Sequence, residues 1–433
     1  MQKKLVLLLF FLLLGENLKA IKLDINLENY FNLKSLNSLR DRDKSYNISY
    51  FVQNSYLYFT LKNIPLEKYD ADMDISIGLR FLNINYSSKT LNTLYINEMY
   101  KYYDSKNIFF YPDKAYVKFY NFPYNDTLLN IGKFPFKIAS GIALDDNQMG
   151  FNGIQIEIQE KLYTDKINLF YFQTESDINT YQTTHHIYGI NINKSFGDGN
   201  WEVYYIKDNA NGYGENIGYT FKNTNKNFYG TSYLIDNEKI SYMIDLVFEG
   251  GNSQKISNQI IEHKAYAYNI NAGWKMKIPI FGKTKTRVGF LKSSGNSSKN
   301  FTKDKSFFSS FSKRYTGFER FGYGEIFKAS IYDTSKTTNT ITGFNENLSG
   351  LTISNLGFDI NYKKGKLVLD YFNYSATKTQ IQTLSTFIGS EYNVKYIFEM
   401  SKNVNLSLTY GSLKLKEQDK PTKLLSISLY SSF

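Results

Sequence analysis

The stretch Leu424-Leu425-Ser426-Ile427-Ser428-Leu429-Tyr430-Ser431-Ser432-Phe433 alternates apolar and polar side chains and ends on an aromatic residue. Leu425, Ile427, Leu429 and Phe433 share one face, whereas Ser426 and Ser428 lie on the other. Such a strand fits a transmembrane β-barrel, because the last strand of a barrel pairs with the first and faces lipid on one side. A terminal strand of a soluble sheet is the alternative interpretation of this segment alone.

The same period-two alternation recurs along the chain in segments of roughly ten residues. In 73–81, 154–158, 242–248 and 266–276, apolar or aromatic side chains occupy every second position and mostly polar or small ones lie between them. No segment after residue 20 has a helical apolar stripe. The chain is therefore predicted to be all-β.

Short polar turns alternate with longer polar stretches, which is the arrangement of outer-membrane barrels. The short turns, assigned to the periplasm, are 122–126, 278–283, 363–366 and 401–403. The longer stretches, assigned to the cell exterior, are 87–112, 250–263, 293–316, 375–390 and 412–421.

The number of strands must be even if both chain ends lie in the periplasm. A direct count gives about 19 alternating segments, and we place the miscount between Gly197 and Lys239. We predict a closed antiparallel barrel of 18 strands, with 16 as the alternative. The last strand is expected to run antiparallel to Ile21–Leu27 and to close the sheet.

The N-terminal segment predicts export. Lys3 and Lys4 precede an unbroken apolar run, Leu5–Leu14, and Leu18-Lys19-Ala20 resembles a cleavage site. We predict a signal peptide over residues 1–20 and a single barrel domain over residues 21–433, located in the bacterial outer membrane. Residues 21–433 contain no run of about 18 apolar residues, so no transmembrane helix is predicted.

The composition agrees with this prediction. Aromatic residues make up 17% of the chain, yet the mean hydropathy is −0.40, as expected for aromatic girdles around a polar lumen. With no Cys, disulfides and thiolate metal sites are excluded. Without residues 1–20 the net charge is +9, which reflects either an AT-rich coding sequence or a lumen that attracts anions. The basic residues are scattered, which argues against nucleic-acid binding.

Two resemblances sharpen the interpretation. The terminal strand resembles the C-terminal assembly signal of bacterial outer-membrane proteins, apart from Ser431, where an apolar residue is usual. This resemblance implies recognition by the barrel-assembly machinery.

The second resemblance is to the alginate-export family of outer-membrane barrels. It rests on Ala115–Phe119, Leu129–Phe136, Ser140–Asn147, Phe151–Ile156, Arg320–Glu325 and Gly350–Leu356. It implies an 18-stranded monomeric barrel that passes solutes through its lumen. Lys133 stands where the family usually has Arg, and Asn152 replaces the usual Asp. These two departures weaken any inference that alginate itself is the solute.

Charged residues on the faces opposite the apolar side chains are predicted to line the lumen, because a basic residue facing lipid near the midplane costs about 2–4 kcal/mol. These pore-lining candidates are Arg80, Lys118, Lys133, Glu157, Asp245, Lys275, Arg287 and Arg320. Simple parity places Lys133 beside Ile131, so Lys133 needs a bulge at Gly132 or a position near the interface. Any one candidate could equally be a solvated side chain without a selective role.

Asp145, Asp146 and Asn147 could bind a cation or form a loop turn. We predict a loop that constricts the lumen, with no metal and no cofactor. His185 and His186 are adjacent and should point to opposite faces of a strand. No Ser or carboxylate is placed in the sequence to suggest a catalytic relay with a histidine, and we predict no enzymatic activity.

The predicted function is a porin-like channel for passive passage of small or oligomeric hydrophilic solutes, anions among them. The alternative is a barrel-anchored structural or adhesive surface protein without a through channel.

Overall fold

The computed structural model describes residues 21–433 except 42–43, 87–106, 147, 161–162, 177–182, 217–218, 256, 298–301, 310, 312–314, 317–318, 332–346, 382 and 417. The predicted signal peptide, residues 1–20, lies outside the described residues. None of the helices within the described ranges is long and apolar enough to cross a membrane.

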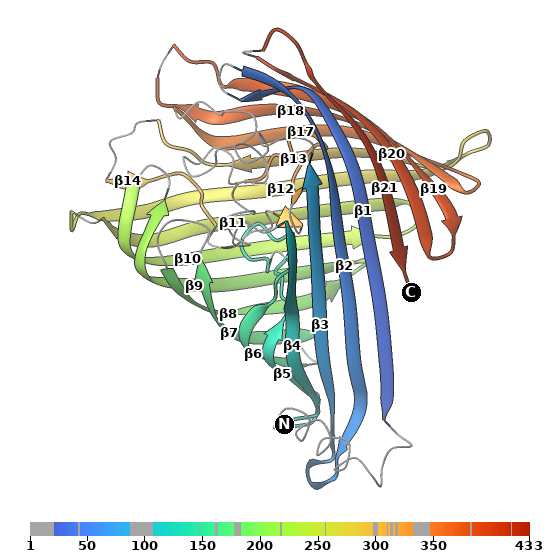
Figure 1. Ribbon diagram of the computed structural model, residues 1–433. Helices are drawn as coiled ribbons and strands as arrows, with labels where there is room; N and C mark the ends of the chain where they lie inside the picture. Colours follow the sequence, from blue (N-terminus) through green and yellow to red (C-terminus); the bar gives the residue numbers. More distant parts are fainter. Residues whose placement is uncertain are drawn as a thin grey trace.

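The chain forms a closed antiparallel barrel of 18 strands, as predicted (Figure 1). The wall strands are β1 (Lys22–Asp41), β2 (Lys44–Leu66), β3 (Ala71–Tyr86), β4 (Ile108–Tyr120), β5 (Thr127–Phe134), β6 (Phe151–Gln159), β7 (Lys166–Ser176), β8 (Thr183–Phe196), β9 (Gly199–Asn216), β10 (Tyr219–Asp236), β11 (Ile240–Lys255), β12 (Ile260–Ile278), β13 (Gly282–Ser293), β17 (Leu348–Tyr362), β18 (Gly365–Thr379), β19 (Phe387–Ser401), β20 (Val404–Leu415) and β21 (Thr422–Ser432). The remaining elements are short: η1 (Glu67–Tyr69), β14 (Lys303–Asp304), β15 (Tyr315–Thr316) and β16 (Glu319–Arg320).

Each wall strand pairs with its neighbours in sequence, and β21 pairs with β1 to close the barrel. The paired segment differs from the prediction. Residues Glu28–Asn37, rather than Ile21–Leu27, lie opposite β21, and Leu27 exchanges two backbone hydrogen bonds of 2.9 Å with Phe433. The difference arises because closing a barrel staggers the first and last strands by the shear of the sheet, which no local sequence pattern encodes.

The alternation explains which side chains face inward. On β12, Ala265 and Ala267 are buried inside the barrel, whereas Tyr266, Trp274 and Met276 on the other face are 39%, 49% and 48% exposed. The outer face is therefore an apolar and aromatic band of the kind that contacts lipid.

The two ends of the barrel differ. The end that holds the start of β1 and the end of β21, here called the terminal end, has short connections, including the predicted turns at 363–364 and 402–403. At the opposite end, called the loop end, the connection between β13 and β17 is the longest.

Some predicted long stretches are mainly strand. The stretch 250–263 was expected to be a loop, but β11 continues to Lys255 and β12 begins at Ile260. β18 likewise extends to Thr379 and β20 to Leu415. Backbone pairing needs no apolar side chains, so these strands continue where the outer face has become polar, beyond the roughly 9–11 residues that span a bilayer.

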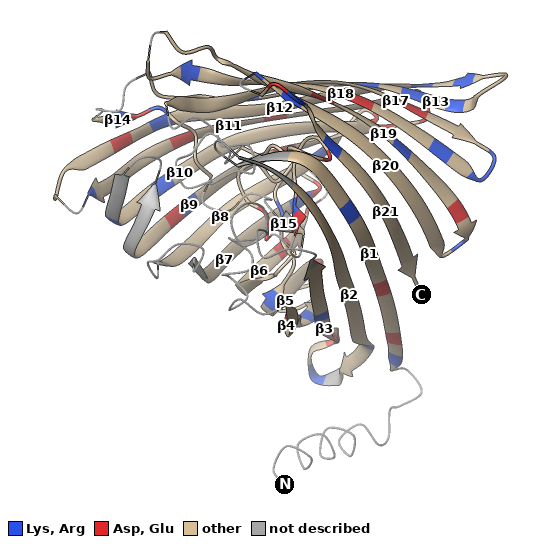
Figure 2. Ribbon diagram, turned by 45° about the horizontal axis from the view of Figure 1, so that its top comes forward, with Lys and Arg blue, Asp and Glu red and all other residues tan. Residues whose placement is uncertain are grey.

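Two chain segments lie inside the barrel (Figures 1 and 2). One is the β5–β6 segment, residues 135–150. The other is formed by parts of the connection between β13 and β17, residues 302–309 and 319–331. β5 and β6, with 8 and 9 residues, are the shortest wall strands, so the β5–β6 segment leaves the wall early and starts deep in the lumen. Phe136, Phe170 and Phe172 pack together there, with ring centroids 4.8 Å apart for the two pairs with Phe136.

Candidate functional site: the lumen

Basic side chains stacked on tyrosine rings line the inner face of β2, β3 and β4. The Arg80 guanidinium lies 4.2 Å from the centre of the Tyr56 ring and 5.9 Å from that of Tyr111, and its Nε lies 3.6 Å from an Asp113 oxygen. Arg80 and Asp113 are both 0% exposed. A cation held against aromatic faces and one carboxylate in this way is fixed in orientation.

The column continues toward the terminal end. The Lys114 ammonium lies 4.3 Å from the centre of the Tyr58 ring, and the Lys118 ammonium lies 4.8 Å from that of Tyr120. Tyr120 donates a hydrogen bond of 2.8 Å to Asp74. We call Arg80, Lys114 and Lys118, with their tyrosines, the basic column. Arg80 and Lys118 were pore-lining candidates; Lys114 has the same inward parity as Lys118 but was not named among them.

Lys133 reaches the same region from the end of β5. Its ammonium donates a hydrogen bond of 3.3 Å to the Pro112 carbonyl and lies 5.8 Å from the Tyr111 ring centre. Gly132 has a φ of 119°, but the ladders on both sides of β5 keep their register. The structure therefore has no bulge at Gly132, and Lys133 is the next-to-last residue of β5; its position near the membrane interface stays a prediction.

The other predicted wall residues face inward in ion pairs. Arg287 bridges Asp359 at 2.7 Å and Asp370 at 3.1 Å. Lys275 contacts Asp236 at 2.6 Å, close to the terminal end. Glu157 contacts Lys166, also at 2.6 Å. In each of these pairs the basic side chain is balanced by at least one carboxylate.

Asp245 holds the β5–β6 segment from a distant part of the wall. It is fully buried on β11 and accepts hydrogen bonds from the Ser140 amide at 3.0 Å, the Ser140 hydroxyl at 2.5 Å and the Tyr204 hydroxyl at 2.9 Å. The segment therefore reaches from β5 to β11 inside the barrel. The role of Asp245 in this geometry is to anchor that segment.

Asp145 and Asp146 lie inside the barrel on the β5–β6 segment, and Asn147 lies outside the described residues. The Asp145 amide donates a hydrogen bond of 3.0 Å to the Phe311 carbonyl. The Asp146 carboxylate accepts from the amides of Gln148 at 3.1 Å and Gly150 at 3.0 Å, which is a turn. Burial and the neighbouring Asp145 raise the pKa of Asp146. Within the described ranges, no group of three or more acidic or histidine side chains is placed to hold a metal ion.

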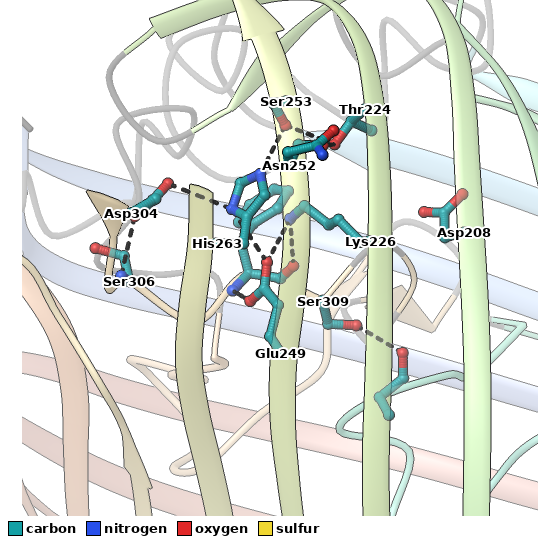
Figure 3. A network of polar contacts seen from close by, with 12 residues as sticks. Asp208, Thr224, Lys226, Glu249, Asn252, Ser253, His263, Asp304, Ser306 and Ser309 are labelled. Carbon is teal, nitrogen blue, oxygen red and sulfur yellow. Dashed lines mark hydrogen bonds and ion pairs between the residues drawn. The ribbon is translucent and has the colours of Figure 1, made fainter. Parts of the chain in front are cut away.

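Segment 302–309 is fixed to the wall by a charged network (Figure 3). Lys226 and Glu249 form an ion pair of 2.8 Å on neighbouring strands. Lys226 also donates to the Phe308 carbonyl at 2.8 Å, and Glu249 accepts from the Phe308 amide at 2.8 Å. Ser309 donates to the Ala143 carbonyl at 2.9 Å, so this segment also contacts the β5–β6 segment.

Segment 319–331 is fixed to separate parts of the wall by polar contacts. Glu391 on β19 is buried and accepts hydrogen bonds from the amides of Glu325, Ile326 and Phe327 at 2.7, 2.8 and 3.0 Å. On the other side, Glu319 forms an ion pair of 2.5 Å with Lys34 of β1. The segment thus bridges two separate parts of the wall.

The charges on this segment are strongly coupled. Burial alone would raise the pKa of Glu319, but Lys34, Lys328 and the hydrogen bonds from Lys34 and Asn32 outweigh it and lower the pKa to about 2. Burial, with Lys34 close by, lowers the pKa of Lys328 to about 8. Arg320, a predicted pore-lining residue, lies on this inner segment and not on the wall, and it is 5% exposed.

The expectation for the histidines was partly wrong. His185 and His186 do point to opposite faces, toward Asp208 at 3.0 Å and toward the Tyr171 hydroxyl at 2.8 Å. However, His263 Nε2 lies 2.6 Å from the Ser253 hydroxyl, and its Nδ1 lies 3.6 Å from Glu249. The expectation failed because adjacent strands bring these residues together. Ser253 and His263 are 0% and 2% exposed, so a substrate has no access to this pair.

The residues that fix the inner segments were missed by sequence reasoning. Glu391 and Glu249 carry a usable signal, since each alternates with outward-facing aromatic residues on its strand. Lys34 and Glu319 carry none, because their contact joins the first strand to a loop 285 positions later.

Comparison with known proteins identifies solved structures with a similar fold. No protein-family model matches the chain, and no curated protein matches it significantly. Among solved structures, it is similar to a BenF-like porin from Pseudomonas fluorescens Pf-5, with 12% identity and a TM-score of 0.57, covering 95% of this chain and 98% of that one.

The chain has the fold of these porins. OccAB4 of Acinetobacter baumannii (12% identity, TM-score 0.55) and Pseudomonas aeruginosa OpdK with vanillate (10% identity, TM-score 0.54) both align over 95% of this chain and 98% of theirs. The resemblance to the alginate-export family is not confirmed by any of these comparisons.

Proposed function

We propose that this protein is a monomeric outer-membrane channel that passes small hydrophilic solutes through its lumen. The terminal end faces the periplasm and the loop end faces the cell exterior. The observation that carries the proposal is the basic column on the inner face of a closed barrel whose outer face is apolar. In cells, insertion of such a chain into the outer membrane would use the barrel-assembly machinery, which would recognise β21.

Anions are the favoured solutes in this proposal. Lys114 and Lys118 of the basic column lie against tyrosine rings, whereas Arg80, Arg287 and Lys275 are ion-paired with carboxylates. Rings of fixed charge select ions of the opposite sign. The vanillate bound to OpdK is an aromatic carboxylate, and tyrosine rings beside cations suit such a solute, so vanillate is a suitable first compound to test.

Planar-bilayer recording of the purified, folded protein tests the channel. We expect discrete conductance steps and a reversal potential, under a KCl gradient, that favours chloride. Addition of vanillate should reduce the current by occupying the lumen. Absence of conductance under every ionic condition would falsify the channel.

Charge reversal of the basic column is a second test. In the Lys114→Glu/Lys118→Glu variant, the anion-to-cation permeability ratio should fall by roughly threefold to tenfold, because two fixed cations become anions. Lys364→Glu/Lys402→Glu, in exposed turns at the terminal end, is the matched control and should keep the wild-type ratio. If the anion-to-cation permeability ratio of Lys114→Glu/Lys118→Glu equals that of the control variant, the basic column does not line the ion path.

The second candidate function is a barrel-anchored surface protein without a channel. The inner segments favour it, since both the β5–β6 segment and segment 319–331 occupy the lumen. Bilayer recording separates the two candidates directly, because an anchor protein gives no conductance.

A further inference from the structure

Two lysines lie on the outer face of the barrel near the place where β21 closes on β1. They are at the edge of the apolar band that is nearer the loop end. Lys423 and Lys414 lie on the adjacent strands β21 and β20, near the loop end, and both are exposed. Figure 1 shows these strands side by side with β1. Lys423 follows the same outward parity as Leu425 and Ile427, and Lys414 follows that of Leu408 and Tyr410.

The two lysines are close enough to contact one ligand. Lys423 lies opposite Ser412 in the ladder, and Lys414 is two residues further along the same face. Diagonal neighbours of this kind are about 7–8 Å apart. Neither ammonium forms an ion pair with a described residue; Lys414 donates to the Asp419 carbonyl at 2.8 Å. Two like charges at this spacing repel unless an anion lies between them.

Further positive charge surrounds the pair. Lys416 and Lys420 are exposed in the connection between β20 and β21, against one exposed carboxylate, that of Asp419, among the described residues there. The local field is therefore positive, which favours a ligand with more than one negative charge.

Below the lysines the surface is apolar. Leu425 is 57% exposed, Tyr410 41%, Leu408 46% and Ile427 43%, and Leu33 on β1, opposite Ile427, is 51% exposed. Lys423 lies nine residues before Ser432 at the end of β21, and about 9–11 residues span the bilayer. The lysines are thus at the level of lipid headgroups, and the apolar strip is at the level of the acyl chains.

We propose that Lys414 and Lys423 bind the phosphates of a phosphorylated lipid of the outer leaflet, whose acyl chains lie along the strip formed by Leu408, Tyr410, Leu425, Ile427 and Leu33. This inference rests on the proposed function, because only placement in the outer membrane brings this face into contact with such a lipid. A bisphosphorylated headgroup suits two cations at this spacing.

Native mass spectrometry of the folded full-length protein in detergent, titrated with bisphosphorylated lipid A, tests the proposal. Wild type should bind lipid A about tenfold more tightly than does the Lys414→Gln/Lys423→Gln variant. It should also prefer lipid A over its dephosphorylated form. The Lys414→Arg/Lys423→Arg variant should retain binding, and Lys364→Gln/Lys402→Gln, which alters two lysines at the terminal end, should match wild type.

Equal binding of phosphorylated and dephosphorylated lipid A by wild type would overturn the proposal, as would undiminished binding by the Lys414→Gln/Lys423→Gln variant. Heat-dependent gel mobility confirms that each variant is folded. Conductance in bilayers of uncharged lipid is measured in parallel. A failure of lipid binding leaves conductance intact, whereas a failure of the channel proposal removes conductance and leaves lipid binding measurable.

Discussion

Deletion of residues 424–433 is expected to abolish the folded barrel. β21 pairs with β20 on one side and with β1 on the other, so its loss leaves two strand edges in lipid. Each unpaired backbone group in the hydrocarbon region costs several kcal/mol. The fraction of protein with the heat-modifiable mobility of a folded barrel should fall more than about tenfold. A truncated chain that still shows this mobility would contradict closure through β21.

A point substitution separates closure from assembly. Phe433 pairs with Leu27 through its backbone, and its side chain is 61% exposed on the outer face. Phe433→Ala keeps both backbone hydrogen bonds, so refolding in detergent should be unchanged. If the assembly machinery reads the terminal aromatic side chain, the amount of assembled protein in cells should fall several-fold. Ser432→Ala is the matched control and should behave as wild type in both measurements.

The wall of the barrel was predictable because its rule is local. Side chains that alternate with period two identify each strand and its lipid-facing side, and the turns after Tyr362 and Ser401 were located from a few residues. The register of closure was not predictable. Whether β21 meets Ile21–Leu27 or Glu28–Asn37 depends on the stagger summed over all strands.

The positions of the inner segments were even less predictable from the sequence than the register of closure. The inward position of Arg80 and Asp245 follows from parity, but their partners do not. Asp245 binds Ser140 from 105 positions away, and Glu391 binds amides 64 to 66 positions away. A loop that returns into a lumen is positioned by single polar contacts with the wall, and one contact leaves no periodic pattern in the sequence.

Glu391→Ala is expected to release segment 319–331 from the wall. The carboxylate accepts three backbone hydrogen bonds and one from the Tyr374 hydroxyl, at 3.2 Å. Hydrogen bonds to a charged group contribute about 1.5–3 kcal/mol each. The free energy of attachment that is lost with the carboxylate therefore far exceeds thermal energy. Alanine also leaves the amides of Glu325, Ile326 and Phe327 without their acceptor in a buried site.

The remaining attachments of the segment include the ion pairs of Glu319 with Lys34 and of Glu325 with Lys395, and the hydrogen bond from the Tyr323 hydroxyl to Asn269. The segment is expected to move within the lumen, so single-channel recordings should show about twofold higher mean conductance and more current noise in the Glu391→Ala variant. Glu399→Ala removes an exposed carboxylate from the terminal end of the same strand and should leave both quantities unchanged. Unchanged conductance in Glu391→Ala, with the barrel folded, would mean that segment 319–331 does not border the ion path. A rise confined to Glu391→Ala would identify this segment as part of the constriction.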